Sequence, residues 1–222
     1  MNYTSLVQAI QDYAENTEQL FVSNIPLFVS QAELRIYNSV QIPVLRKNVT
    51  GNVTTSNPYL SCPDDFMAVY SVATISVSGA YNFLIDKDVS FVREAYPNPS
   101  VTGLPKYYAI FGTQLTFPTE LSLILTPTPD ANYGVELHYY YMPESITTTA
   151  SGTTWLSDNY DPVLFYGAMR EAMIFMKGEA DMVGYYEQKY QEALGQLKRL
   201  GDGLERGDSY RNNQTKLPYS SL

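Results

Sequence analysis

The sequences VELHYYY, residues 135–141, and DPVLFYGAMREAMIFMK, residues 161–177, mark a change of hydrophobic period within a short part of the chain. Every second residue from Val135 is apolar or aromatic, which predicts a strand with one buried face. Asp161-Pro162 is a helix N-cap residue followed by proline in the first turn, which predicts a helix as far as about Lys177. The chain therefore changes from strands to helices between these two sequences.

Two helices are predicted at the N-terminus. Apolar residues three or four apart, from Leu6 to Leu20, predict a first helix over about 4–20. Asn24 with Pro26 predicts the start of a second helix, which Pro43 ends. Together they form a predicted helical hairpin.

A last helix is predicted over about 179–200, where apolar residues again recur three or four apart. Glycines at 201, 203 and 207 are expected to fray its end. The polar residues 207–222 are predicted to form a flexible C-terminal arm that a partner orders.

Residues 44–145 have the composition and turn spacing of short strands. A long strand is predicted at about 67–77. Its predicted inward face consists of Met67, Val69, Ser71, Ala73, Ile75 and Val77. Asp88 is predicted to cap a short helix that runs through Ala95.

These patterns predict an α+β fold, a discontinuous helical bundle with an inserted antiparallel β domain. The bundle combines the N-terminal helical hairpin with two C-terminal helices, over residues 1–43 and 153–206. The inserted β-rich domain covers residues 44–152.

The composition limits the partners. Fourteen basic and twenty-three acidic residues give a formal net charge of −9, the wrong sign for neutralising the phosphates of nucleic acid. No stretch approaches the roughly 18 apolar residues of a membrane-spanning helix, so no membrane partner is expected. The twenty tyrosines suit half-buried sheets, subunit interfaces and sugar-binding platforms alike.

Few residues could carry catalysis. The single cysteine, Cys62, and the single histidine, His138, leave few metal-ligand sets or nucleophile pairs, and no phosphate-binding loop, nucleophile elbow or zinc-binding helix motif occurs. Paired acidic residues such as Asp64-Asp65 lie where turns and helix starts favour them. We therefore predict no catalytic residue, no metal site and no cofactor, and expect a protein that is not an enzyme.

Several short sequences occur in order along residues 3–206. They are PDDF at 63–66, GLP at 103–105, YYAI at 107–110, LTFP at 115–118, PTP at 127–129, VELHYY at 135–140, WL at 155–156, DPVLFYGA at 161–168 and EA at 171–172. The series resembles the head-to-tail adaptor, or connector, family of tailed phages, which is similar in architecture to tail tubular protein A of short-tailed phages.

The resemblance implies a structural virion protein, assembled in the host cytoplasm and located in the neck or tail of the particle. In the family, twelve copies form a ring between the portal protein and the downstream tail or nozzle protein, and the helical part builds the ring. DNA passes through the channel during ejection without tight binding, which the acidic charge also favours.

The resemblance further implies that the C-terminal arm docks onto the portal or onto a neighbouring subunit. Arg206, Arg211 and Lys216 give the arm a positive balance unlike the rest of the chain. The predicted docking residues are Tyr210, Arg211, Leu217 and Tyr219.

Two other interpretations stay open. One is another neck or tail accessory protein of a phage. The other is a tyrosine-rich carbohydrate-binding β module, in which Trp155-Leu156 or the tyrosines would offer a sugar platform. A lectin-like module should present several aromatic rings on one exposed β face, whereas an adaptor should bury tyrosines between subunits.

Overall fold

The structure, a computed structural model, describes residues 1–76, 78–113 and 121–205. They divide into two compact units. One combines Met1–Val44 with the described residues from Glu144 onward, and the other is Leu45–Pro143. Residues 144–152, which sequence analysis places in the β-rich domain, cluster with the helices.

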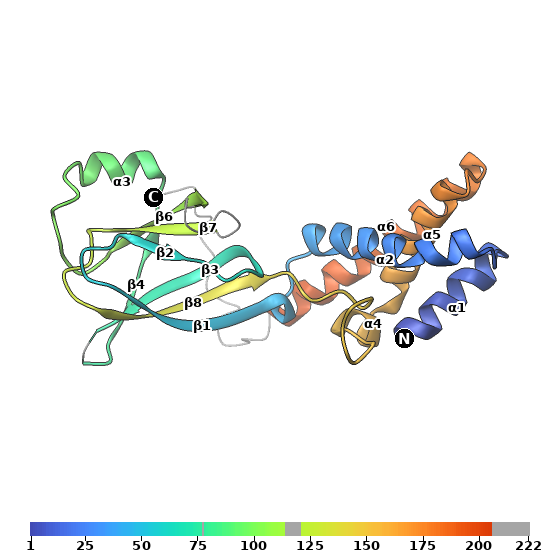
Figure 1. The fold of residues 1–222 in the computed structure, drawn as a ribbon, viewed down its shortest axis with the longest axis horizontal. Helices are drawn as coiled ribbons and strands as arrows, with labels where there is room; N and C mark the ends of the chain where they lie inside the picture. The colour runs from blue at the N-terminus through green and yellow to red at the C-terminus, as the bar shows by residue number, and fades with distance from the viewer. Residues whose placement is uncertain (77, 114–120, 206–222) are drawn as a thin grey trace. The chain divides into compact units, whose positions relative to one another are not determined.

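The first unit is helical (Figure 1). Its helices are α1 (Tyr3–Ala14), α2 (Gln19–Ser39), α4 (Trp155–Asn159), α5 (Asp161–Phe175) and α6 (Ala180–Glu205). Each long helix buries one apolar side, for example Ile10 of α1, Ile36 of α2 and Leu197 of α6. Helix α5 begins at Asp161 with the proline in its first turn, as predicted. The predicted cap is wrong, because the N-cap residue is Tyr160 and no side chain makes a capping hydrogen bond.

The predicted boundary between the first two helices is wrong. Helix α1 ends at Ala14, because Glu15 adopts a left-handed backbone with φ 48°. Helix α2 begins at Gln19 and continues through Pro26. Burial of Phe21 and Ile25 outweighs the usual preference of proline for a helix start.

The predicted end of the last helix is also too early. Helix α6 continues through Gly201 and Gly203 to Glu205. Gly201 is buried against Ile42, so closely that an added Cβ atom would overlap the Ile42 side chain. Packing therefore explains this glycine, which does not end the helix.

The second unit is a β-sandwich with one short helix (Figure 1). One sheet has the order β1-β8-β3-β4 and the other β2-β7-β6-β5. The strands are β1 (Arg46–Val53), β2 (Tyr59–Ser61), β3 (Phe66–Ile75), β4 (Tyr81–Phe83), β5 (Ile85–Asp86), β6 (Tyr107–Thr113), β7 (Leu121–Thr126) and β8 (Tyr133–Tyr141). A 3-10 turn (Pro43–Leu45) precedes β1, and helix α3 (Val89–Ala95) covers the outer face of the second sheet.

The two sheets share one core. Val135, Leu137 and Tyr139 of β8 pack against Leu123 and Leu125 of β7, as the alternating pattern predicts. The β5–β6 pair is parallel, so the predicted all-antiparallel pairing holds for every other strand pair among the described residues.

The predicted face of the long strand is wrong. Register shifts interrupt β3 between Phe66 and Ala68 and again between Val69 and Ser71. Each shift moves the following residues to the opposite face, so Val69 and Val72 both join the core. The α+β fold class is confirmed.

Candidate functional site

The outer side of α2 carries a stripe of leucines. Leu20, Leu27 and Leu34 are 67%, 51% and 50% exposed. They are seven residues apart, so they lie almost in line along the helix. We call this surface the leucine stripe.

The charged side chains of α2 lie off the stripe: Glu33 is buried, and the Arg35 side chain is 35% exposed and paired with Glu171 and Glu187. The other exposed residues are Gln19, Ser23, Pro26, Gln31, Asn38 and Ser39. Depletion of charge around exposed apolar side chains is the composition of protein–protein interface cores. In a chain with charge −9, this face is suited to contact with another protein.

The buried side of α2 holds the stripe in place. Phe28 packs on Phe175 of α5, with ring centroids 5.2 Å apart. Gly167 of α5 allows close approach, because an added Cβ would lie 3.0 Å from the Cβ of Ala32 and 3.3 Å from the Tyr190 ring. The stripe is therefore presented on a packed element.

A charged cluster joins α2, α5 and α6. Arg35 lies 3.3 Å from Glu171 and 3.6 Å from Glu187, and Arg170 contacts the same two carboxylates. Burial raises the pKa of Glu187, but hydrogen bonding from Gln191 and the two arginines outweigh burial and leave that pKa below its ordinary value. The cluster pairs its own charges and serves packing.

A second apolar surface lies at the start of α5. A cavity of about 210 Å³ is lined by Met1, Ala9, Tyr13, Asp161, Pro162, Phe165 and Tyr166. Tyr13 is 63% exposed and meets Phe165 edge to face at 5.0 Å. This exposed tyrosine is typical of an interface residue.

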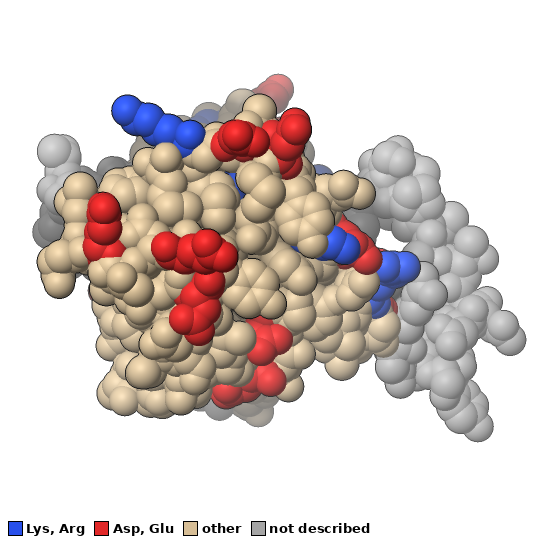
Figure 2. Space-filling view, turned by 90° about the vertical axis from the view of Figure 1, so that its right-hand side faces the viewer, with Lys and Arg blue, Asp and Glu red and all other residues tan. Residues whose placement is uncertain are grey.

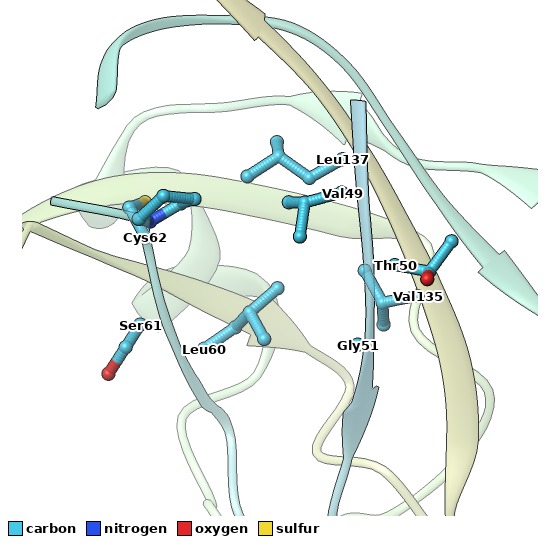
Figure 3. Close-up of a pocket in the computed structure, with 9 residues that line it drawn as sticks. Val49, Thr50, Gly51, Leu60, Ser61, Cys62, Val135 and Leu137 are labelled. Carbon is cyan, nitrogen blue, oxygen red and sulfur yellow. The ribbon is translucent and has the colours of Figure 1, made fainter. Parts of the chain in front are cut away.

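The β-sandwich has a groove between its edge strands β1 and β2 (Figure 3). Its volume is about 240 Å³, and it is lined by Val49, Thr50, Gly51, Leu60, Ser61, Cys62, Pro63, Val135 and Leu137. The side chain of Leu60 points across it toward Val49 and Leu137, which lie side by side on the paired strands β1 and β8 (Figure 3). The groove is largely apolar and contains no cluster of reactive groups.

Near one end of the groove, Asp65 links β1 to β8. The Lys47 ammonium lies 2.7 Å from the Asp65 carboxylate, and the Tyr139 hydroxyl donates to Asp65 at 2.8 Å. Burial raises the pKa of Asp65, but these two donors outweigh burial and lower it overall. Burial, together with the hydrogen bond to Asp65, raises the pKa of Tyr139 to about 12.

The outer face of the first sheet does not form a flat sugar platform. Tyr70 and Tyr140 meet there edge to face, 78° apart. The Arg46 guanidinium lies 4.2 Å from the Tyr70 ring centroid and 5.2 Å from that of Tyr140. The rings therefore pack on a cation of the same sheet, and a sugar would have to displace it.

The other residues singled out in the sequence lie in ordinary surroundings. His138 is 3.4 Å from the Ser71 hydroxyl and 3.9 Å from Glu136, as expected for neighbours on one strand face. Cys62 is buried beside the groove, and Trp155 opens α4. Asp88 precedes α3 without a capping hydrogen bond from its side chain. Tyr210, Arg211, Leu217 and Tyr219 lie outside the described residues.

The described surface carries more acidic than basic groups and shows no metal-binding cluster. Figure 2 shows acidic groups separated by uncharged areas, with fewer basic groups on this face. Within the described ranges no three His, Cys, Asp or Glu side chains lie close enough to hold a metal ion. The helices described here include none that is long and apolar enough to cross a membrane.

An α+β chain with a leucine stripe, a tyrosine-lined surface and an open sandwich edge has several surfaces suited to contact with other proteins. In the comparison with family models, the SU10 adaptor protein model matches residues 1–216. The chain therefore belongs to the SU10 adaptor protein family and is a structural adaptor of a phage virion. No curated protein sequence matches it.

Proposed function

We propose that the chain is the head-to-tail adaptor that forms a homo-oligomeric ring between the portal and the tail and continues the DNA channel. The match to the adaptor family over residues 1–216 is the observation that carries this proposal. A similarity in architecture to tail tubular protein A stays a prediction.

The leucine stripe supplies the subunit contact in this proposal. A closed ring needs heterologous interfaces, in which one face of a subunit meets a different face of its neighbour. Two chains of charge −9 repel each other, and the uncharged face of α2 lets them meet with least repulsion. The surface around Tyr13 is available as the complementary face.

The remaining parts have separate roles. Twelve copies surround the channel, and their acidic charge lets DNA pass without tight binding. The C-terminal arm, with Tyr210, Arg211, Leu217 and Tyr219, docks the subunit onto the portal or a neighbouring copy. A downstream tail or nozzle protein completes the neck.

Mass determination of the purified chain, alone and mixed with the portal ring of its phage, tests this function. The wild-type chain is expected to join the portal as a ring of copies. Leu27→Glu puts a charge at the centre of the stripe and should prevent ring formation, while changing the free energy of unfolding by less than about 0.5 kcal/mol because the residue is exposed.

Gln188→Glu is the matched control, because it adds the same charge at an exposed position of α6. It should assemble like the wild type. A wild-type chain that stays monomeric in the presence of the portal contradicts the proposed function. Normal assembly of Leu27→Glu would show that copies meet through another face.

A further inference from the structure

The groove of the β-sandwich lies between two strand edges. Strand β1 is the outermost strand of one sheet and β2 of the other, and each pairs on one side only among the described strands. Along residues 47–53, no described residue makes a backbone hydrogen bond to the outer side of β1. An edge with unpaired N–H and C=O groups can accept an added strand.

The walls of the groove suit an extended chain with alternating apolar side chains. Val49 of β1 is 40% exposed although it is apolar; it lies beside Leu137 and faces Leu60 (Figure 3). At Gly51 an added Cβ would meet no described atom within 4 Å. Every second side chain of a strand lying along β1 would therefore enter apolar space.

The chain itself contains a segment with this pattern. Leu217 and Tyr219 are two residues apart, so in an extended strand both side chains lie on one face. Pro218 lies between them, and the N–H that proline lacks would be on the side away from β1. A proline at this position is therefore compatible with pairing to one edge and prevents pairing on the other.

The charges also agree. Lys216 precedes this segment in the basic arm, and exposed Asp64 follows Pro63 at the rim of the groove. Asp64 is therefore a candidate partner for Lys216, beside the Lys47–Asp65 pair that already lies at this end of the groove.

We propose that the groove of one copy binds residues 216–222 of another copy, added as a strand to the edge of β1. The choice of another copy rests on the proposed ring, in which neighbouring copies raise the effective concentration of the segment. Each arm then links two subunits.

Photo-crosslinking of the full chain tests this site. Leu217 is replaced by a photoreactive phenylalanine analogue, and equal amounts of heavy-isotope and natural-isotope chain are mixed, with and without the portal ring, then irradiated and digested for mass spectrometry. The expected crosslinks join the segment to residues 49–51, 60–63 or 135–137, in peptides of mixed isotope composition. Crosslinks to the helices, crosslinks within one copy, or none would overturn the proposal.

A filled groove provides the second measurement. Gly51→Leu places a side chain in the open space of the groove and should abolish the crosslink while circular dichroism stays unchanged. Gly184→Leu, on α6, where an added Cβ also meets nothing, is the control and should leave the crosslink intact. Loss in both variants or in neither contradicts the groove.

The crosslink is measured separately from assembly of the chain on the portal. A chain that crosslinks between copies but never joins a portal ring would retain the groove and refute the proposed function. A chain that joins the portal without these crosslinks would retain the proposed function and refute the groove.

Discussion

Among single residues, Glu33 shows how a buried charge ties two parts of the helical unit together. The side chain is 3% exposed and accepts a hydrogen bond from the Ile146 N–H at 3.0 Å. Burial raises the pKa of this carboxyl group, and the bonds from Ile146 and Ser145 lower it by less. The bond fixes α2 to the segment that enters the helical unit after β8.

Glu33→Gln tests this interpretation through the pH dependence of the free energy of unfolding. Because the pKa of Glu33 is raised in the folded state, its contribution to stability is present below the unfolded pKa and is lost as pH rises through the folded pKa. Glutamine keeps an acceptor for Ile146 and does not ionise. The variant should therefore gain stability relative to the wild type as pH rises above about 4, the ordinary pKa of a glutamate, measured by urea unfolding.

Glu33→Ala provides the comparison. It removes the acceptor and should cost about 1–3 kcal/mol at low pH, because a buried N–H is left without its partner. The cost should shrink as pH rises, because alanine, like glutamine, does not ionise. An equal pH dependence of Glu33→Gln and the wild type would contradict the assignment.

At the level of elements, the last turns of α6 depend on a glycine that packs. Gly201→Ala would place a methyl group onto Ile42, whereas Gly203→Ala would meet nothing within 4 Å among the described atoms. We expect Gly201→Ala to lower the free energy of unfolding by about 1–3 kcal/mol through overpacking. Gly203→Ala should raise it by about 0.5–1 kcal/mol through helix propensity. Thermal or urea unfolding measures both, and equal effects would exclude the Ile42 contact.

Elements with a strong local signal could be predicted from the sequence. The alternation in β8 and the Asp161-Pro162 start of α5 are such signals, and both are confirmed. The break at Glu15 and the bulges in β3 could not be predicted, because they depend on one left-handed residue and on pairing with β8.

The surfaces were harder to predict than the elements. Leu20, Leu27 and Leu34 have a visible seven-residue spacing, but the wrong helix boundary placed Leu20 on the buried face of the first helix. The groove depends on which strands become sheet edges, and non-local pairing decides that.

For the whole molecule, the charge predicts weak interaction with DNA. The net charge is −9, and the proposed ring of such subunits would repel a duplex in its channel. Fluorescence anisotropy with duplex DNA should therefore show no binding in the micromolar range at about 150 mM salt. A micromolar dissociation constant there would contradict a passive channel.

The central claim is that this chain is the ring between portal and tail. Electron cryo-microscopy of the purified phage particle, at a resolution that distinguishes the α2 leucines and the β-sandwich, tests it most directly. The account predicts a closed ring of this chain directly below the portal, with α2 at the contact between neighbouring copies. Density for this chain elsewhere in the particle, or a neck complete without it, would contradict the account.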